Sequence, residues 1–325
     1  MTWLVWRQYR AQGAIAFALL AAFAAVILAD GFQLASHWHS ILTTCSGHSA
    51  CLQQQGPLVN GVLSDLPDIS LIVPTVLGIL WGAPLVAHEL ESRTTDFAWA
   101  QSVTRTRWLA VKIGWLLLAA AACGGVIAAL TTWWSGPINA LSASAFVPGQ
   151  FDTQGIVPIG YAVFAMALGI AAGTVARRTL PAIAVALGGF VALRLVISTF
   201  LRPHYIAAVT TYYKVTGSFT PPGQAWVLSQ GGVSRTGVTV AQGWGDLYPA
   251  LPAVCRRLLP GAPTGKSGSE NAVFSCMQAH GWRGFATYQP AARYWPFQGI
   301  ETGIYVLLAA ALIAVTVVII RKRDA

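Results

Sequence analysis

Histidines and cysteines gather in one polar segment in the first sixth of the chain. His37, His39, Cys45, His48 and Cys51 follow the spacing H-x-H-x5-C-x2-H-x2-C. Imidazole and thiolate groups are the usual ligands of structural zinc, so this spacing allows a metal site. Two cysteines six residues apart also close a disulfide readily in an oxidising compartment, and structural zinc sites usually contain tighter cysteine pairs. We favour a Cys45–Cys51 disulfide and keep zinc binding, or neither, as alternatives.

A second pattern looks like a nucleotide site but lacks the required spacing. The segment Gly261-Ala-Pro-Thr-Gly-Lys-Ser267 has three residues between its glycines, whereas a phosphate-binding loop has four. It follows no strand of a βαβ unit, and it lies in a part of the chain that we place outside the cell, where ATP is scarce. We expect this chain to bind no cofactor.

A polar segment with charges of both signs, residues 88–112, separates two apolar runs. Its charged residues are Glu89, Glu91, Arg93, Asp96, Arg105, Arg107 and Lys112, and its aromatic residues are Phe97, Trp99 and Trp108. Aromatic side chains set among charges suit docking to another protein. The alternative is that these charges only flank a membrane.

Six apolar runs organise the rest of the chain. Hydrophobic residues make up 55% and charged residues 10% of the sequence, whereas soluble domains contain about 25% charged residues. A helix of about 20 residues crosses a bilayer core of about 30 Å. The runs are Gly13–Ala29, Ile69–Ala87, Ile113–Leu130, Ile156–Ala176, Leu180–Leu201 and Gly299–Ile320. We therefore predict an all-α polytopic membrane protein with six transmembrane helices, located in the cell (plasma) membrane.

Basic residues lie on alternate sides of these runs. The short segments on one side carry eleven lysines and arginines, and those on the other side carry none. They are Arg7, Arg10, Arg93, Arg105, Arg107, Lys112, Arg177, Arg178, Arg321, Lys322 and Arg323. The positive-inside rule therefore predicts that both termini are cytoplasmic. It also accounts for the net charge of +9 without a nucleic-acid partner, so we expect none.

The remaining segments complete the predicted domain plan. Residues 1–12 mix aromatic and basic side chains, which suits an interfacial amphipathic helix on membrane lipid; the alternative is an aromatic flank of the first span. Residues 13–201 hold helices 1–5, with a first outer loop at residues 31–68. Residues 202–298 are rich in Gly, Pro, Ser and Thr and are predicted to form a small extracytoplasmic domain, with Cys255 and Cys276 as a possible disulfide. Residues 299–325 hold helix 6 and a basic cytoplasmic tail.

Arg194 is the one basic residue inside a predicted span. It lies toward the outer end of the fifth span, where its guanidinium can reach the interface by snorkelling. The alternative is an ion pair with Asp30 or Glu301, which should lie at a similar depth. Such a pair would fix the bundle or line a substrate route.

The polar segment and the last span resemble permease subunits of ABC-2 type transporters. In that family an acidic turn ends the second membrane helix, and an Arg and a Lys lead into the third. The residues that carry the resemblance are Glu89-Leu-Glu91, Arg93-Thr94, Ala100-Gln-Ser-Val-Thr-Arg105, Trp108 and Lys112. The segment from Tyr288 to Glu301 resembles an actinobacterial branch. Arg93 replaces the usual Gly, and Gln101-Ser102 replaces the common Leu-Pro.

The resemblance implies a transport subunit, not an enzyme, that works with a separate ABC ATP-binding subunit. It implies that this subunit docks on the 88–112 loop. There we expect Glu89, Glu91 and Arg93 to form ionic contacts with it, and Trp99 and Trp108 to form apolar contacts. Arg105 and Lys112 complete the predicted docking set. It also implies a second permease subunit, identical or a sibling, and efflux of a substrate. The scarcity of charge in the spans suits an apolar or amphipathic molecule such as a drug, peptide or lipid. A membrane-embedded enzyme, or a non-transporting sensor or assembly factor acting through residues 202–298, is the alternative.

Overall fold

The computed structural model describes residues 2–45, 66–91, 105–136, 139, 144, 146, 148–215, 222, 224–237, 239–241, 251–258 and 270–323. The chain divides into two compact units. One unit comprises Met1–Ser142, Val147–Arg202 and Trp295–Ala325, and the other comprises Ala143–Phe146 and Pro203–Tyr294.

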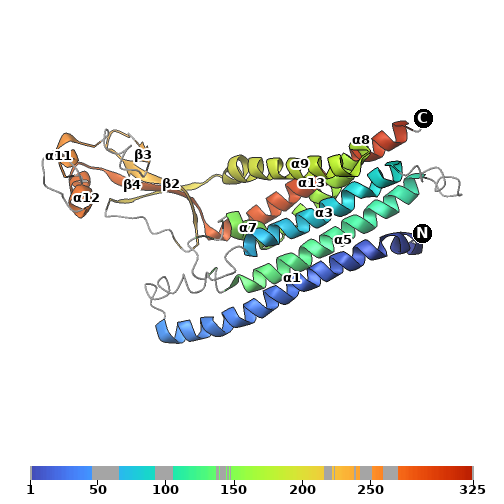
Figure 1. The fold of residues 1–325 in the computed structure, drawn as a ribbon. Coiled ribbons are helices and arrows are strands. Elements are labelled where there is room, and N and C mark those ends of the chain that lie inside the picture. The colour runs from blue at the N-terminus through green and yellow to red at the C-terminus, as the bar shows by residue number, and fades with distance from the viewer. Residues whose placement is uncertain are drawn as a thin grey trace. The chain divides into compact units, whose positions relative to one another are not determined.

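The first unit is a bundle of long helices (Figure 1). These are α1 (Thr2–Cys45), α3 (Leu66–Glu91), α5 (Arg105–Trp134), α7 (Pro148–Thr153), α8 (Val157–Ala176), α9 (Thr179–Val196) and α13 (Tyr294–Arg323). A π-helix, Ile197–Leu201, and a 3-10 turn, Arg202–His204, extend α9. The start of α1, the end of α3, the start of α5 and the end of α13 lie at one end of the bundle in Figure 1.

Within the described part of the chain, five helical segments are long and apolar enough to cross a membrane. They are Gly13–Gln33, Ala110–Trp134, Val157–Ala176, Thr179–His204 and Ala291–Lys322. These segments confirm a multi-pass membrane protein. In α3 the apolar segment among the described residues is shorter, Ile72–Pro84, so the second of the six predicted spans stays a prediction.

The closest helix pair in the bundle is α3 with α8, and glycines allow the close approach. A Cβ on Gly169 would lie 2.9 Å from the backbone nitrogen of Ala83, and one on Gly78 would lie 3.0 Å from the carbonyl of Ala162. Small residues matter here because lipid provides no hydrophobic drive for helix association, so backbones gain from direct contact. Gly169 and Gly173, the small-xxx-small pair of the sequence, both face the backbone of Ala83.

Helix α1 is longer than the first predicted span. It runs from Thr2 to Cys45, so residues 2–12 are helical, and their predicted place at the membrane interface stays a prediction. The predicted first outer loop at 31–68 is wrong at its start, because the helix continues through Asp30 for about four more turns. Helix α5 pairs with this part of α1. The ring of Phe32 lies edge-on to Trp133, with centroids 5.6 Å apart.

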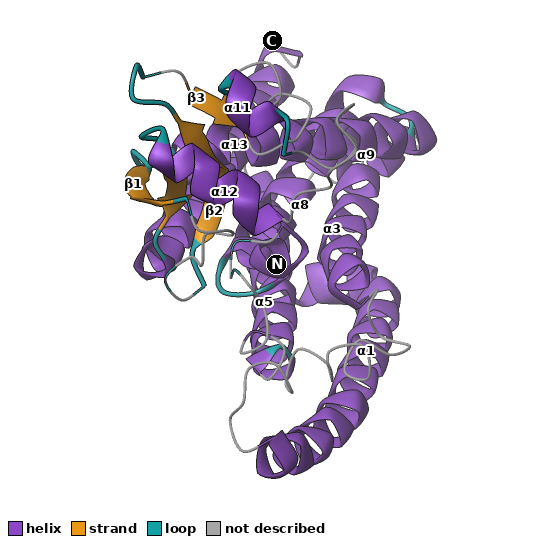
Figure 2. Ribbon diagram, turned by 90° about the vertical axis from the view of Figure 1, so that its left-hand side faces the viewer, coloured by secondary structure: helices purple, strands orange, loops and turns teal. Residues whose placement is uncertain are grey.

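The second unit contains an antiparallel four-stranded sheet in the order β1-β4-β2-β3, drawn in orange in Figure 2. The strands are β1 (Val209–Lys214), β2 (Trp226–Val233), β3 (Thr239–Ala241) and β4 (Arg283–Gln289). Two helices, α11 (Ala253–Arg256) and α12 (Glu270–Ala279), complete the described part of this unit. The prediction of an all-α protein therefore holds for the bundle and fails for this unit.

A small hydrophobic core joins the two helices to the sheet. Val273 and Met277 of α12 and Cys255 of α11 pack with Val240 of β3 and with Trp282, all nearly inaccessible to solvent. A disulfide links Cys255 to Cys276, the pair considered in the sequence analysis. Cys45 ends α1, whereas Cys51 lies outside the described residues, so a Cys45–Cys51 bond stays a prediction.

Candidate functional site

Five polar side chains meet inside the bundle at the end where α8 and α13 begin and α9 ends. Asp152 comes from α7, Tyr161 from α8, Arg194 from α9, Arg202 from the 3-10 turn and Glu301 from α13. Asp152 and Glu301 are 0% exposed and Arg202 is 1% exposed. We call these five residues the buried charge cluster.

Arg202 is the centre of the buried charge cluster. Its Nε donates to Oε2 of Glu301 at 2.8 Å and its Nη2 donates to Oε1 of Glu301 at 2.7 Å. The same Nη2 also donates to Oδ1 of Asp152. The guanidinium carbon lies 4.4 Å from the ring centroid of Phe151, which places the cation over an aromatic face. Arg202 therefore ties three elements, α7, α13 and the end of α9.

Asp152 has a second cationic partner in Arg194. Nη2 of Arg194 lies 2.5 Å from Oδ2 of Asp152, so each oxygen of this carboxylate accepts from a different arginine. The side chain of Arg194 is 22% exposed, more than the other charged members. Two arginines and two carboxylates leave the buried charge cluster neutral as a whole. Neutrality matters because an unpaired charge buried in a low-dielectric interior is strongly destabilising.

Tyr161 joins the two carboxylates from the side of α8. Its hydroxyl donates to Oε1 of Glu301 at 2.8 Å, with Oδ1 of Asp152 at 3.1 Å as a second acceptor. Its ring packs edge-on against Tyr305 of α13 at 4.7 Å and against Phe190 of α9 at 5.8 Å. Ring contacts from α9 and α13 thus hold the phenol beside the carboxylates of α7 and α13.

Gln298 fixes the corner between α7 and α8 beside the cluster. Its Oε1 accepts from the backbone N–H groups of Ile156 and Val157, both at 3.0 Å, and its Nε2 donates to the carbonyl of Phe151 at 2.9 Å. Helix α8 lacks a side-chain cap of its own, so a glutamine from α13 satisfies its first N–H groups. Gly155, at φ +68°, passes so close to this amide that a Cβ would lie 2.7 Å from Oε1.

The arrangement favours mechanical anchoring over chemistry. Each carboxylate is already paired with an arginine, and Tyr161 donates to both. Such a set holds α7, α8, α9 and α13 in one geometry, because moving any member alone would separate buried opposite charges.

The ion pairs differ from the pairing that the sequence analysis offered as the alternative to snorkelling. Arg194 is bonded to Asp152, whereas that alternative named Asp30 or Glu301. Glu301 instead pairs with Arg202, and Asp30 accepts a hydrogen bond from Nε1 of Trp134 at 2.6 Å. The reason is that α7 packs in the bundle and brings in an acid from the segment between the third and fourth apolar runs.

Sequence reasoning missed Asp152, Tyr161 and Arg202. One signal was present: Asp152 is the only acidic residue between 97 and 245. It is a lone carboxylate in a long segment, and Arg194 and Arg202 lie near the end of the fifth apolar run. This pattern favours pairing between Asp152 and these two arginines. Arg202 was placed in the outer domain because the apolar run ends one residue earlier.

The predicted docking residues lie where α3 ends and α5 begins. Glu89 and Glu91 are in the last turn of α3, and Arg105 and Trp108 are in the first turns of α5. Arg93 and Trp99 lie outside the described residues. Lys112 belongs to α5 and is 1% exposed, and its part in docking stays a prediction.

The described residues contain one group with metal-ligand chemistry: Cys255, Cys276 and His280. Nδ1 of His280 lies 3.9 Å from each sulfur, but both sulfurs are joined in the disulfide. A disulfide sulfur has no thiolate to offer a metal, so this group holds no site in the oxidised state. His48 and Cys51 of the alternative zinc site lie outside the described residues.

Long apolar helices joined by glycine contacts and an internal ion-pair cluster define a polytopic membrane protein. The family model described as "ABC-2 membrane transporter related" matches residues 17–202, and the chain belongs to this family. The match spans α1 to α9 and ends at Arg202. No curated protein and no solved structure matches the chain. Family membership points to the permease of an ABC transporter, and so to a transport subunit.

Proposed function

We propose that this chain is the membrane subunit of an ATP-driven exporter in the plasma membrane. The observation that carries the proposal is the family match over residues 17–202, which covers most of the helical bundle. The chain supplies the membrane passage, and a separate ABC ATP-binding subunit supplies the energy. Both termini and the segment between α3 and α5 lie in the cytoplasm, as the placement of basic residues favours.

The ATP-binding subunit binds the segment between α3 and α5. Glu89, Glu91, Arg93 and Arg105 provide ionic contacts, and Trp99 and Trp108 provide apolar anchors. The near-contact between the backbones of α3 and α8 at Gly169 supports a route for the motion. A displacement of α3 by the ATPase must carry α8 with it, because there is no side-chain layer between the two backbones that could deform.

A second permease, identical or a sibling, completes the transporter. The bundle leaves large apolar side chains on its outer faces, among them Phe17, Leu180 and Leu307 at 74%, 81% and 72% exposure. Membrane lipid or the second permease covers these faces. An apolar or amphipathic substrate moves outward when the two bundles change between two packed states.

The buried charge cluster holds the far ends of α7, α8, α9 and α13 together while the ATPase end moves. Motion applied at α3 is then transmitted as a tilt of a rigid group of helices. We do not assign the cluster to the substrate route, because its charged groups bind one another and not a substrate.

The test is co-purification of this chain with an ABC ATP-binding subunit of its own cell. Wild type and Glu89→Lys/Glu91→Lys are solubilised in mild detergent and captured through a C-terminal tag, with Arg321→Glu/Lys322→Glu as a matched change of charge at the same face. We expect wild type and the control to retain the ATPase, and the acidic-pair variant to lose it with unchanged thermal unfolding. If wild type captures no ATPase, the proposal is wrong.

A further inference from the structure

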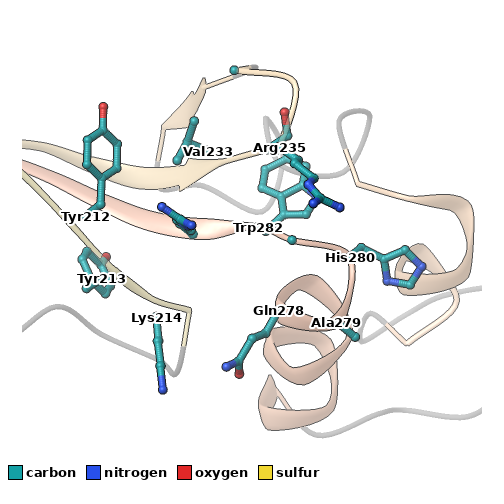
Figure 3. A pocket seen from close by; sticks show the side chains of 13 residues that line it. Tyr212, Tyr213, Lys214, Val233, Arg235, Gln278, Ala279, His280 and Trp282 are labelled. Atoms are coloured by element: carbon teal, nitrogen blue, oxygen red, sulfur yellow. The ribbon is translucent and has the colours of Figure 1, made fainter.

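The sheet unit contains a hollow that the transport proposal does not use. It has a volume of about 1080 Å³ and lies at one edge of the sheet (Figure 3). Three strands meet there: β1 and β2 end at the hollow and β4 begins at it. The last residues of α12 and the turn that follows it close another side. We call this hollow the strand-edge pocket.

The strand-edge pocket is basic. Lys214, Arg235, Arg283 and His280 line it, and none of its lining residues within the described part of the chain is acidic. Lys214 of β1 is directly opposite Arg283 of β4 in the strand register. Two positively charged side chains therefore stand side by side at this end of the sheet, and a bound anion would reduce the repulsion between them.

The surrounding sequence reinforces this polarity. Residues 203–294 contain seven lysines and arginines but only two acidic residues. One of the two, Glu270, is at the opposite end of α12 from the strand-edge pocket, and the other, Asp246, lies outside the described residues. The positive excess therefore belongs to the whole segment, and three of its seven cations line the pocket.

The end of α12 is built so that it does not repel an anion. The N–H of Gly281 donates to the carbonyl of Gln278 and the N–H of Trp282 donates to that of Met277, both at 3.0 Å. Gly281 takes the left-handed conformation, φ +78°, that this helix ending requires. The last carbonyls are thereby satisfied, which reduces the negative potential at this terminus.

The same turn positions Arg235. A Cβ built on Gly281 would lie 3.3 Å from Cδ of Arg235, so the stem of this arginine rests on the backbone of the turn. Only a residue without a side chain leaves that room. Figure 3 shows Arg235 beside Trp282, which is 5% exposed and anchors the turn in the core. The turn at Gly281 thus limits the positions that the side chain of Arg235 can take.

Two tyrosines add a hydrogen-bond donor and an apolar wall. The ring of Tyr213 lies over Gly284, where any Cβ would collide with it. Burial raises the pKa of Tyr213, so its hydroxyl keeps its proton at neutral pH and can donate. Tyr212 is 61% exposed at the mouth and offers an aromatic face to the apolar part of a ligand.

We infer that the strand-edge pocket binds the phosphate or carboxylate group of an amphipathic anion, through Arg235, Arg283 and Lys214. Arginine forks match the geometry of both groups. A lipid headgroup and a free anion share this chemistry. The inference does not depend on the transport proposal, because it requires neither the ATPase nor movement of the bundle.

Calorimetric titration of the full-length protein in phosphatidylcholine nanodiscs tests the inference. The probes are a short-chain phosphatidic acid, the matching short-chain phosphatidylcholine and inorganic phosphate. The variants are Arg235→Gln and Arg283→Gln, with Lys214→Gln as an independent variant. Arg257→Gln is the control, because it makes the same charge change on an exposed arginine of this unit that does not line the pocket.

We expect phosphatidic acid to bind more tightly than phosphatidylcholine and each pocket variant to weaken that binding roughly tenfold or more, with the control unchanged. Inorganic phosphate binding as tightly as phosphatidic acid would assign the pocket to a free anion, and much weaker phosphate binding would assign it to a lipid. The inference is overturned if neither anionic probe binds to wild type, or if Arg257→Gln weakens binding as much as the pocket variants do.

Discussion

Arg202 and Glu301 are 99 positions apart in the chain and form a two-armed ion pair inside the bundle. Both nitrogen–oxygen distances are below 3 Å, at 2.8 and 2.7 Å, and both side chains are covered from solvent. One residue closes the α9 segment and the other belongs to the second turn of α13. The pair therefore joins the segment that leads into the sheet unit to the segment that leaves it.

Glu301→Gln and Arg202→Lys should each destabilise the bundle. Removing one member of a buried ion pair leaves the other charge without compensation, at a cost of about 3–5 kcal/mol. Lysine keeps the positive charge but lacks the planar guanidinium that donates to both Glu301 and Asp152. Arg202→Lys should therefore still lower the free energy of unfolding. Thermal unfolding of the purified protein in detergent, followed by intrinsic fluorescence, measures the effect.

A double variant, Arg202→Met/Glu301→Leu, separates pairing from packing. It removes one positive and one negative charge and leaves Arg194 with Asp152. We expect it to be less destabilised than the sum of Arg202→Met and Glu301→Leu measured separately. Additive losses would show that the two charges do not stabilise each other.

The same substitution at two glycines should have opposite effects. In Gly169→Ala the new methyl would lie 2.9 Å from the nitrogen of Ala83, so α3 and α8 must separate. In Gly188→Ala the methyl meets nothing within 4 Å, and alanine stabilises a helix over glycine by about 1 kcal/mol. The melting temperature should fall in the first variant and hold or rise in the second. A parallel response would contradict the close packing of α3 on α8.

Gln298→Met should loosen the start of α8. Methionine fills a similar volume but neither accepts from Ile156 and Val157 nor donates to Phe151, so buried N–H groups lose their partner. Each such loss costs about 1–3 kcal/mol. Amide hydrogen exchange at residues 156–160 should accelerate, while exchange in α5 serves as the internal control. Unchanged protection at these residues would show that water replaces the amide.

Loss of the Cys255–Cys276 disulfide should weaken the sheet unit. The bond closes a loop with a sequence separation of 21, for which the gain in stability is about 3 kcal/mol. Cys255→Ala/Cys276→Ala should become sensitive to limited proteolysis within residues 251–280. Cys123→Ala, at a free cysteine of α5, is the control and should digest like wild type.

The helical part of the fold could be predicted because hydrophobic length alone decides it. The apolar runs at Ile156–Ala176 and Leu180–Leu201 correspond to α8 and to α9 with its π-helical extension. The end of α1 was not predictable in this way. Polar residues after Asp30 favoured a loop, but no proline follows, and the isolated Gly31 packs under the ring of Trp133.

The strands were hidden by an irregular pattern. In β2 the pairing with β4 shifts between Val227 and Ser229, which interrupts the alternation of inward and outward side chains. Two glycines, Gly231 and Gly232, remove two further side chains from that pattern, the second to make room for Trp282. The charge cluster was hidden for a different reason: Arg194 had two plausible acids on neighbouring spans, and its actual partner is in a helix of only six residues.

The π-helix Ile197–Leu201 gives α9 a helical phase that an ordinary helix would not have. In an α-helix, residues eight apart such as Arg194 and Arg202 differ by about 80° around the axis. The wider turn, closed by the bond from the N–H of Arg202 to the carbonyl of Ile197, takes up one more residue and brings both guanidinium groups to the same carboxylate. The number of residues in this turn is therefore more tightly constrained than the type of each residue. Exchanging one aliphatic side chain for another preserves the phase, whereas deleting a single residue turns Arg202 away from Asp152.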